Sequence, residues 1–206
     1  MEAIYSKMLG ANSNYGSFLP DSILKHPYED ERRCYALVTD GDWVFHDGWS
    51  NITPLLNEID TNAWITPQLH HTFLTLHPHA DKYTVDWQEL VKEVDKIPTY
   101  TVTFDRVIPV KTGFVLCGIP SIDINAYRNT LREKGFIQEE RYHCDIAHAT
   151  LIRCIGPVNN YDQVMSDWMG LPKMPYATLE VKKINILKAS WCMYPGTYFL
   201  ALKNIQ

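Results

Sequence analysis

The chain has 206 residues, of which 46% are hydrophobic and 21% are charged, so it can bury a core and is not disordered. Nineteen basic against 24 acidic residues give a formal net charge of −5, which argues against a protein that coats long duplex nucleic acid, because such proteins carry a cationic surplus. No apolar run approaches the roughly 18 residues of a membrane span, and no secretory signal is visible. Five dispersed cysteines without a CxxC motif favour reduced thiols in a cytoplasmic protein over a disulfide framework.

The first part of the chain is polar and rich in turn-forming residues. We expect residues 1–33 to form an irregular arm or lid. A first strand is predicted over 34–39, which reads CYALVT. The Asp40-Gly41 pair that follows is a turn signal, so residues 43–45 are expected to fold back as a hairpin.

The remaining chain alternates between helical and strand-like patterns. In chain order, the patterns predict helices over 52–59, 85–97, 124–134 and 161–169, and strands over 69–76, 100–110, 113–119, 146–155, 177–187 and 197–203. Asp123 and Gly135 are typical residues for the two ends of the third helix. Arg128 and Arg132, four residues apart on that helix, are expected on a solvated face. Helices that join strands next to hairpins favour an α+β fold with largely antiparallel sheets.

One pattern, His-x-Thr followed by two apolar residues, occurs twice within strand-like segments. HHT begins at His70 and HAT begins at His148. Because alternate residues of a strand point to the same face, His70 and Thr72 project together, as do His148 and Thr150. Chance alone gives about 0.6 such triplets in a chain of this composition, so the pattern by itself is also compatible with two strand histidines that bond backbone carbonyls.

Two imidazoles and two hydroxyls that face one cleft suit phosphodiester chemistry. One neutral His can take a proton from water or from a ribose 2′-hydroxyl, while a second, protonated His donates a proton to the leaving oxygen. His is the side chain whose ordinary pKa lets both forms exist near neutrality. Thr hydroxyls can hydrogen-bond the phosphate oxygens. This chemistry requires no metal and no other cofactor.

With these motifs, the sequence resembles the 2H phosphoesterase superfamily, which is named for two His-x-(Thr/Ser)-x motifs. The superfamily includes RNA 2′,3′-cyclic phosphodiesterases and viral enzymes that destroy 2′-5′ oligoadenylate or cyclic oligonucleotide signals. Family members often show phrases similar to FDRV at 104–107, and the run GFVL at 113–116 follows it here. A helix that ends in KGF at 134–136 precedes the second motif, as in the family. The resemblance covers roughly residues 34–203 and is most specific at the two motifs.

The resemblance implies a bilobal α+β fold in which residues 34–206 form a single domain. In that fold, two pseudo-symmetric, mainly antiparallel sheets with flanking helices surround a central groove. It further implies that His70 and His148 act as acid and base and that Thr72 and Thr150 bind phosphate. Which histidine is the acid depends on the direction of the reaction.

Two positions depart from the family pattern or complicate it. Ala147 stands before the second motif, where the family often has Pro. His71 offers a second imidazole beside His70 and leaves a register ambiguity of one residue. Only His70 has Thr two residues later, so His70 is the predicted catalytic residue.

A nucleotide substrate needs aromatic stacking partners and a cation near the motifs. The candidates for substrate binding are Tyr142, Arg153, Trp191 and Tyr198. Arg153 follows His148 at an odd offset of five, out of phase with the motif on a regular strand. The acidic net charge and the arm favour a small substrate: a 2′,3′-cyclic phosphate at an RNA end, a 2′-5′ oligonucleotide or a cyclic (oligo)nucleotide. An enzyme that clears a nucleotide immune signal fits this description.

Two alternatives remain open. The first is a non-catalytic nucleotide-binding protein on the same fold, although binding alone does not need two imidazoles. The second is a zinc hydrolase that uses the segment from His77 to Asp81, which reads HPHAD and is similar to the zinc loop of metallo-β-lactamase-like hydrolases. Lys82 stands where that loop would have a further His. The sequence predicts no membrane partner and no particular oligomeric state.

Overall fold

A computed structural model describes residues 3–6, 8, 17–26, 29, 31–58, 62–66, 68–139, 143–190 and 199–200. In chain order its elements are the 3-10 helix η1 (Ser22–Lys25), β1 (Arg33–Phe45), α2 (Trp49–Glu58), β2 (Ala63–Ile65), β3 (Thr72–His77), the 3-10 helix η3 (Ala80–Lys82), α3 (Trp87–Val94), β4 (Tyr100–Val110), β5 (Gly113–Pro120), α4 (Ile124–Glu133), β6 (Ala147–Cys154), α5 (Tyr161–Met169), β7 (Ala177–Ser190) and β8 (Phe199–Leu200).

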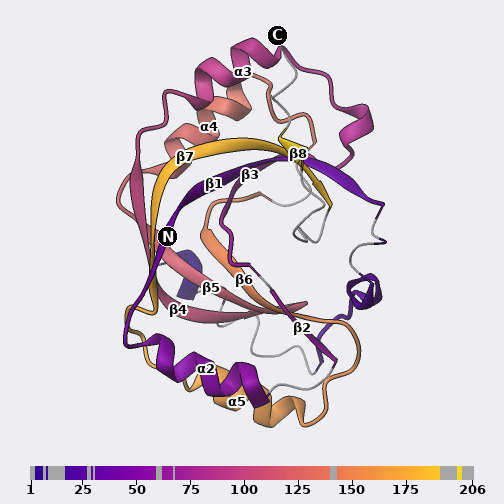
Figure 1. Ribbon diagram of the computed structural model, residues 1–206, viewed down its shortest axis with the longest axis vertical. Helices are drawn as coiled ribbons and strands as arrows, with labels where there is room; N and C mark the ends of the chain where they lie inside the picture. Colours follow the sequence, from indigo (N-terminus) through magenta and orange to yellow (C-terminus); the bar gives the residue numbers. More distant parts are fainter. Residues whose placement is uncertain are drawn as a thin grey trace.

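The strands form one curved sheet. Its order is β2-β6-β5-β4-β7-β1-β3, with β8 paired to β7, and each pairing between these strands is antiparallel. Helices α3 and α4 lie together at one end of the molecule and α2 and α5 at the other, with the sheet between them (Figure 1). The predicted α+β class with antiparallel strands and flanking helices is confirmed, although the strands belong to one sheet and not to the two that the resemblance implied. Among the described helices, none is long and apolar enough to cross a bilayer.

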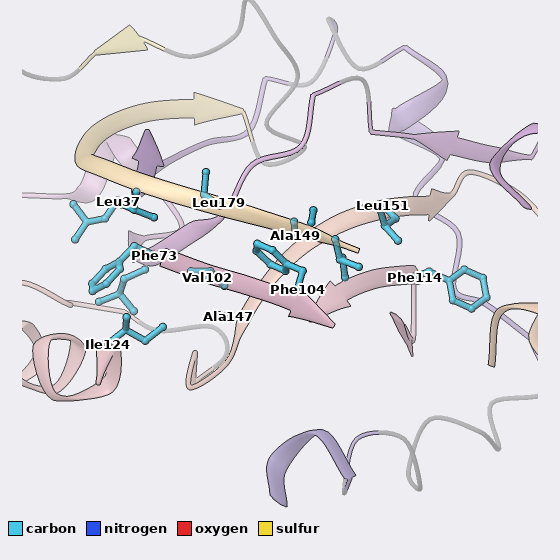
Figure 2. Packing of buried hydrophobic residues seen from close by; sticks show 14 of the residues in the cluster. Leu37, Phe73, Val102, Phe104, Phe114, Ile124, Ala147, Ala149, Leu151 and Leu179 are labelled. Atoms are coloured by element: carbon cyan, nitrogen blue, oxygen red, sulfur yellow. The ribbon is translucent and has the colours of Figure 1, made fainter. Parts of the chain in front are cut away.

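The main hydrophobic core is built from the central strands and the helices that cover them. Val102 and Phe104 of β4 and Phe114 of β5 are fully buried and belong to one cluster. Figure 2 shows these side chains together with Ile124, which comes from α4. The ring of Trp168 in α5 stacks on Phe114 with centroids 4.6 Å apart. Burying a side chain of this size contributes roughly 1.5–3 kcal/mol to folding, so the aromatic contacts attach the helices firmly to the sheet.

Both predicted ends of α4 are confirmed. The Asp123 carboxylate accepts hydrogen bonds from the N–H groups of Asn125 and Ala126 at 3.1 and 3.3 Å. Gly135 follows the helix with a φ of 76°, a conformation that favours glycine because a Cβ would be strained there. The caps fix the position of α4, which carries Arg128.

The predicted hairpin at residues 43–45 is wrong. β1 is continuous and pairs with β7 along its whole length, with a shift in register between Asp40 and Gly41. A Cβ atom at Gly41 would lie 1.9 Å from the carbonyl oxygen of Glu180. Gly41 therefore permits a close approach of two backbones at a β-bulge, whereas the sequence pair Asp-Gly was interpreted as a turn.

The other predicted helices and strands are present, with shifts at their ends. The short strand β2 was not predicted, because three residues are too few for a periodic signal. Of the predicted strand 197–203, the described part is β8, and its remaining residues lie outside the described ranges.

Two described parts of the predicted arm, residues 1–33, contact the rest of the chain. Residues 3–6 are helical, and Tyr5 among them is fully buried. Phe18 packs edge-on against Phe114 with ring centroids 5.3 Å apart. These contacts attach the arm to the sheet, and a role for it as a lid stays a prediction.

Replacing Gly41 by Ala should destabilise the protein, because the added methyl group would overlap the Glu180 carbonyl and force two strands apart. Overpacking of this kind costs about 1–3 kcal/mol. Because the close contact is with backbone, we expect the loss in G41A to lie at the upper end of this range. The measurement is the free energy of unfolding in urea. The control is G135A, where a Cβ would meet nothing within 4 Å and only the positive φ is unfavourable. A smaller loss in G41A than in G135A would contradict the bulge.

Candidate functional site

The two ends of the sheet meet where the two motif strands come together (Figure 1). β2 pairs with β6, and the Thr66 N–H then donates to the carbonyl oxygen of Leu151 at 2.9 Å. The chain departs from β6 and returns to it at His71, which forms an antiparallel bridge with Ala149. β6 is therefore bordered at both ends by the stretch of chain that contains the first motif.

This bridge sets the motif side chains across from one another. The two bridged residues are fully buried, so the residues next to them in the strand point to the opposite face. Continuing the antiparallel register by one residue in each direction sets His70 across from Thr150 and Thr72 across from His148. All four of these side chains are partly exposed. Tertiary pairing thus gathers two imidazoles and two hydroxyls on one face.

His71 belongs to the core side of this contact. Its Nδ1 lies 3.1 Å from the carbonyl oxygen of His148, and because a carbonyl only accepts, Nδ1 carries the proton. Burial, followed by the positive charge of Arg128, holds the pKa of His71 well below its usual range. His71 is therefore a neutral residue that ties the motif strands together, and His70 is the imidazole that shares a face with the other motif.

Arg128 of α4 links the same two strands from the core. Its side chain is fully buried, and its Nε and Nη2 donate to the carbonyl oxygens of Phe73 at 2.7 Å and Ile146 at 2.9 Å. Its Nη1 donates to the Oδ1 of Asn125 at 2.9 Å. Phe73 lies in β3 and Ile146 directly precedes β6, so one guanidinium spans both strands.

The prediction that Arg128 lies on a solvated helix face is wrong. Spacing of four residues shows that Arg128 and Arg132 share a side of α4, but it does not show what covers that side. Arg132 is partly exposed, whereas the Arg128 side chain is fully buried and donates to the backbone carbonyl oxygens of Phe73 and Ile146. A buried cation beneath the motifs was therefore the main feature that the sequence did not reveal.

Both motif histidines are mainly neutral at pH 7. Burial, then the charge of Arg128, lowers the pKa of His148 to about 4. Burial also lowers the pKa of His70, against the opposing effect of the Gln68 carbonyl oxygen 3.2 Å from its Nδ1. Smaller contributions from Arg153 lower both pKa values, so Arg153 lies within electrostatic reach of both rings. The Nδ1 of His148 is buried and has no hydrogen-bond partner among the described residues.

Arg153 lies on the face of the second motif, contrary to the expectation from its odd offset. Alternate residues of β5 pair with Arg153, Thr150 and His148. Because alternate residues share a face and paired residues face the same way, these three side chains lie on one face. The register shifts where β6 has an extra residue, Leu151. This irregularity turns Arg153 toward the motif.

A cavity of about 650 Å³ opens beside His70, a size typical of small-molecule sites. Its described lining includes three aromatic side chains, Trp43, Phe45 and Trp49. The pairing of β1 with β3 ends at Val38, so the rest of β1 has one edge toward this space. These aromatic residues were not predicted as part of the site. Trp43 and Phe45 belong to the segment that was expected to fold back as a hairpin.

Tyr5 is a further residue that was not predicted at the site. It clusters with the β5 residues that pair with Thr150 and His148, so it packs on the face of the second motif. Its hydroxyl accepts a hydrogen bond from the Ala147 N–H at 3.2 Å. A single aromatic residue in a polar arm gives no periodic signal that would have indicated this contact.

Three of the residues nominated for substrate binding, Tyr142, Trp191 and Tyr198, lie outside the described residues. Their proximity to the motifs stays a prediction.

The His77 and His79 pair does not gather further metal ligands in the described part of the chain. The Nδ1 of His77 accepts from the His79 N–H at 2.9 Å, and its Nε2 lies 3.9 Å from a carboxylate oxygen of Glu139. Within the described ranges, no group of three or more His, Cys, Asp or Glu side chains could hold a metal ion. This arrangement gives no support to the zinc-hydrolase alternative.

Comparisons with known proteins leave the chain without an assigned family. No protein-family model matches the sequence, and no curated protein matches it. Among solved structures, the crystal structure of E. coli LigT complexed with NADP+ is similar at 17% sequence identity and a TM-score of 0.46. The match covers 82% of this chain and 94% of that chain.

Replacing Arg128 by Met should strongly destabilise the protein. The variant removes the Arg128 donor from two carbonyl oxygens and one amide oxygen, and a buried group that is left unsatisfied costs about 1–3 kcal/mol. We expect a loss of about 3 kcal/mol or more in the free energy of unfolding, measured in urea. The matched control is R132M, since Arg132 donates to Asn129 and Cys144 from a partly exposed position on the same helix. Equal losses in the two variants would contradict the role of Arg128 as the link between the strands.

Proposed function

We propose that the protein is a metal-independent phosphodiesterase of the 2H type, which cleaves a nucleotide phosphodiester by two-histidine acid–base catalysis. The observation that carries the proposal is the bridge between His71 and Ala149, because its register sets the two His-x-Thr motifs across from one another on one face. A fold that merely buried two strand histidines would have no reason to leave both of them partly exposed, with His70 on the wall of a cavity.

The proposed reaction uses one motif histidine in its neutral form and the other in its protonated form. The neutral ring takes a proton from water or from a ribose 2′-hydroxyl, and the resulting oxygen nucleophile forms a bond to phosphorus. The bond from phosphorus to the leaving oxygen breaks, and the protonated ring supplies the proton that this oxygen needs. The roles of acid and base are exchanged when the reaction runs in the opposite direction.

The other polar groups on this face suit a phosphate. The hydroxyls of Thr72 and Thr150 can donate hydrogen bonds to non-bridging phosphate oxygens, and the fixed charge of Arg153 can offset the charge that develops on them. A bound phosphate is also an anion close to both histidines, so its charge raises their pKa values and favours the protonated form that the acid requires.

The substrate we propose is small: a 2′,3′-cyclic phosphate at an RNA end, a 2′-5′ oligonucleotide or a cyclic (oligo)nucleotide. A net charge of −5 is unfavourable for long duplex nucleic acid, whose binding depends on many basic contacts. A cavity of about 650 Å³ instead matches the size range of small ligands. The clearing of a nucleotide immune signal is one role that such an activity would serve.

Substitution of either motif histidine should abolish turnover while the protein stays folded. We expect H70A and H148A each to lower kcat by about 10²–10⁴-fold, because each removes one partner of the proton transfer. The assay offers 2′,3′-cyclic mononucleotides, 2′-5′ oligoadenylate and cyclic di- and trinucleotides in the presence of a chelator, and products are identified by mass. The control is H79A, an exposed histidine outside the motifs, which should retain full activity.

The same assay separates the proposal from its alternatives. Turnover that needs His79 and is lost in chelator would support the zinc hydrolase. Nucleotide binding without turnover of any substrate, in the wild-type protein and in both motif variants, would support the non-catalytic binding protein.

The pH profile of kcat/KM should be bell-shaped and acidic. The lower limb reports the loss of the neutral base as pH falls toward the His148 pKa of about 4. The upper limb reports the loss of the protonated acid as pH rises through the second pKa, which lies below 6.5 because the pKa of His70 is also lowered. We therefore expect the maximum between about pH 4 and pH 6.5.

The matched variant for the pH profile is R153Q. It removes a positive charge that lowers both pKa values, so both limbs should move to higher pH. A wild-type maximum above pH 8, or limbs that do not move in R153Q, would contradict the assignment of the limbs to these two histidines.

A further inference from the structure

The cavity beside His70 has an aromatic wall that the proposed chemistry does not use. Trp43 and Phe45 lie two residues apart on β1, so their side chains share a face. Their rings are nearly parallel, with an interplanar angle of 15° and centroids 6.4 Å apart. Trp49 of α2 extends this wall, with its ring centroid 4.6 Å from that of Phe45.

The wall is held in place from the core and is open toward the cavity. Trp43 stacks on the fully buried Phe104 with centroids 5.1 Å apart and an interplanar angle of 26°, which restrains its ring. Phe45 lines the cavity and is 50% exposed, so part of its ring is accessible to a ligand. An open, restrained aromatic surface is a platform on which a flat ring can stack at little entropic cost.

Polar residues also line the same cavity. The Oγ1 of Thr66 is buried and has no hydrogen-bond partner among the described residues, and Thr66 lines the cavity. Asn185 of β7 also lines the cavity, and its Nδ2 donates to the carboxylate of Asp40 at 3.3 Å. The side-chain amide of Asn185 has donors and an acceptor that can pair with the hydrogen-bonding edge of a nucleobase.

We propose that this cavity is the subsite for a purine nucleobase, which stacks on Trp43 and Phe45 while the phosphate attached to its ribose lies at His70. The proposal rests on the proposed function for the place of the phosphate. The cavity wall includes His70 but none of the other motif residues, so the base lies on the side of the first motif. A purine is favoured over a pyrimidine because two fused rings cover more of the aromatic wall.

The test is the binding of adenosine 2′-monophosphate, which contains no phosphodiester bond and therefore cannot be turned over. Its Kd is measured by calorimetry for the wild-type protein, F45A and V44A, together with the Kd of cytidine 2′-monophosphate and of inorganic phosphate. V44A is the matched control, since Val44 lies next to Phe45 on the opposite face of β1 and is 44% exposed. Both variants truncate a similarly exposed side chain of the same strand to Ala.

We expect F45A to raise the Kd of adenosine 2′-monophosphate by about 5- to 150-fold, whereas V44A should leave this Kd unchanged. Inorganic phosphate should bind all three proteins with the same Kd. The wild-type protein should bind the adenosine nucleotide more tightly than the cytidine nucleotide. Equal Kd values in F45A and V44A would overturn the subsite, and equal Kd values for the two nucleotides would overturn the purine assignment.

The binding experiment can fail or succeed separately from the turnover assay that tests the proposed function. Loss of binding in F45A alone, without turnover of any substrate, would support the subsite and contradict the catalytic proposal. Turnover that depends on His70 and His148, with binding that is unaffected in F45A, would support catalysis and overturn the subsite.

Discussion

The structure depends on one contact, the antiparallel bridge that joins the two ends of a curved sheet at His71 and Ala149. A single bridge is a small contact between strands, and the core reinforces it twice. The His71 imidazole donates to the carbonyl oxygen of His148, and the buried Arg128 guanidinium donates to backbone on both sides. Each bond involves a group that would be costly to bury unpaired, so the two strands are strongly favoured to stay in register.

The same reinforcement sets the electrostatics of the face above it. A buried cation beneath the motifs disfavours a second positive charge on either His71 or His148. The rings are thus neutral beside the positive charges of Arg128 and Arg153, which both lower the pKa of His148. Catalysis by two histidines needs one proton on the pair, and in the proposed reaction the charge of the bound phosphate favours its uptake.

Local signals predicted most of the secondary structure. The helices were indicated by their periodicity and by caps such as Asp123 and Gly135, because these signals depend on neighbours in sequence. The signals failed where a backbone irregularity depends on a partner strand. Asp40 and Gly41 lie at a β-bulge between β1 and β7 and do not form a turn. In β6, the extra residue Leu151 places Arg153 on the same face as His148 and Thr150. Neither irregularity can be read from a single strand, since pairing in register is what defines it.

The sequence by itself determined that the His and Thr of each motif point the same way in an extended segment, because alternation is a local property of extended backbone. It also determined the class of chemistry that two imidazoles and two hydroxyls can perform. Only the tertiary structure decided that His70 and not His71 shares the face of the second motif, that Arg128 is buried, and that Trp43 and Phe45 line a cavity beside His70. The physical reason is that burial and facing depend on which strands and helices cover a side chain, and these lie far away in the chain.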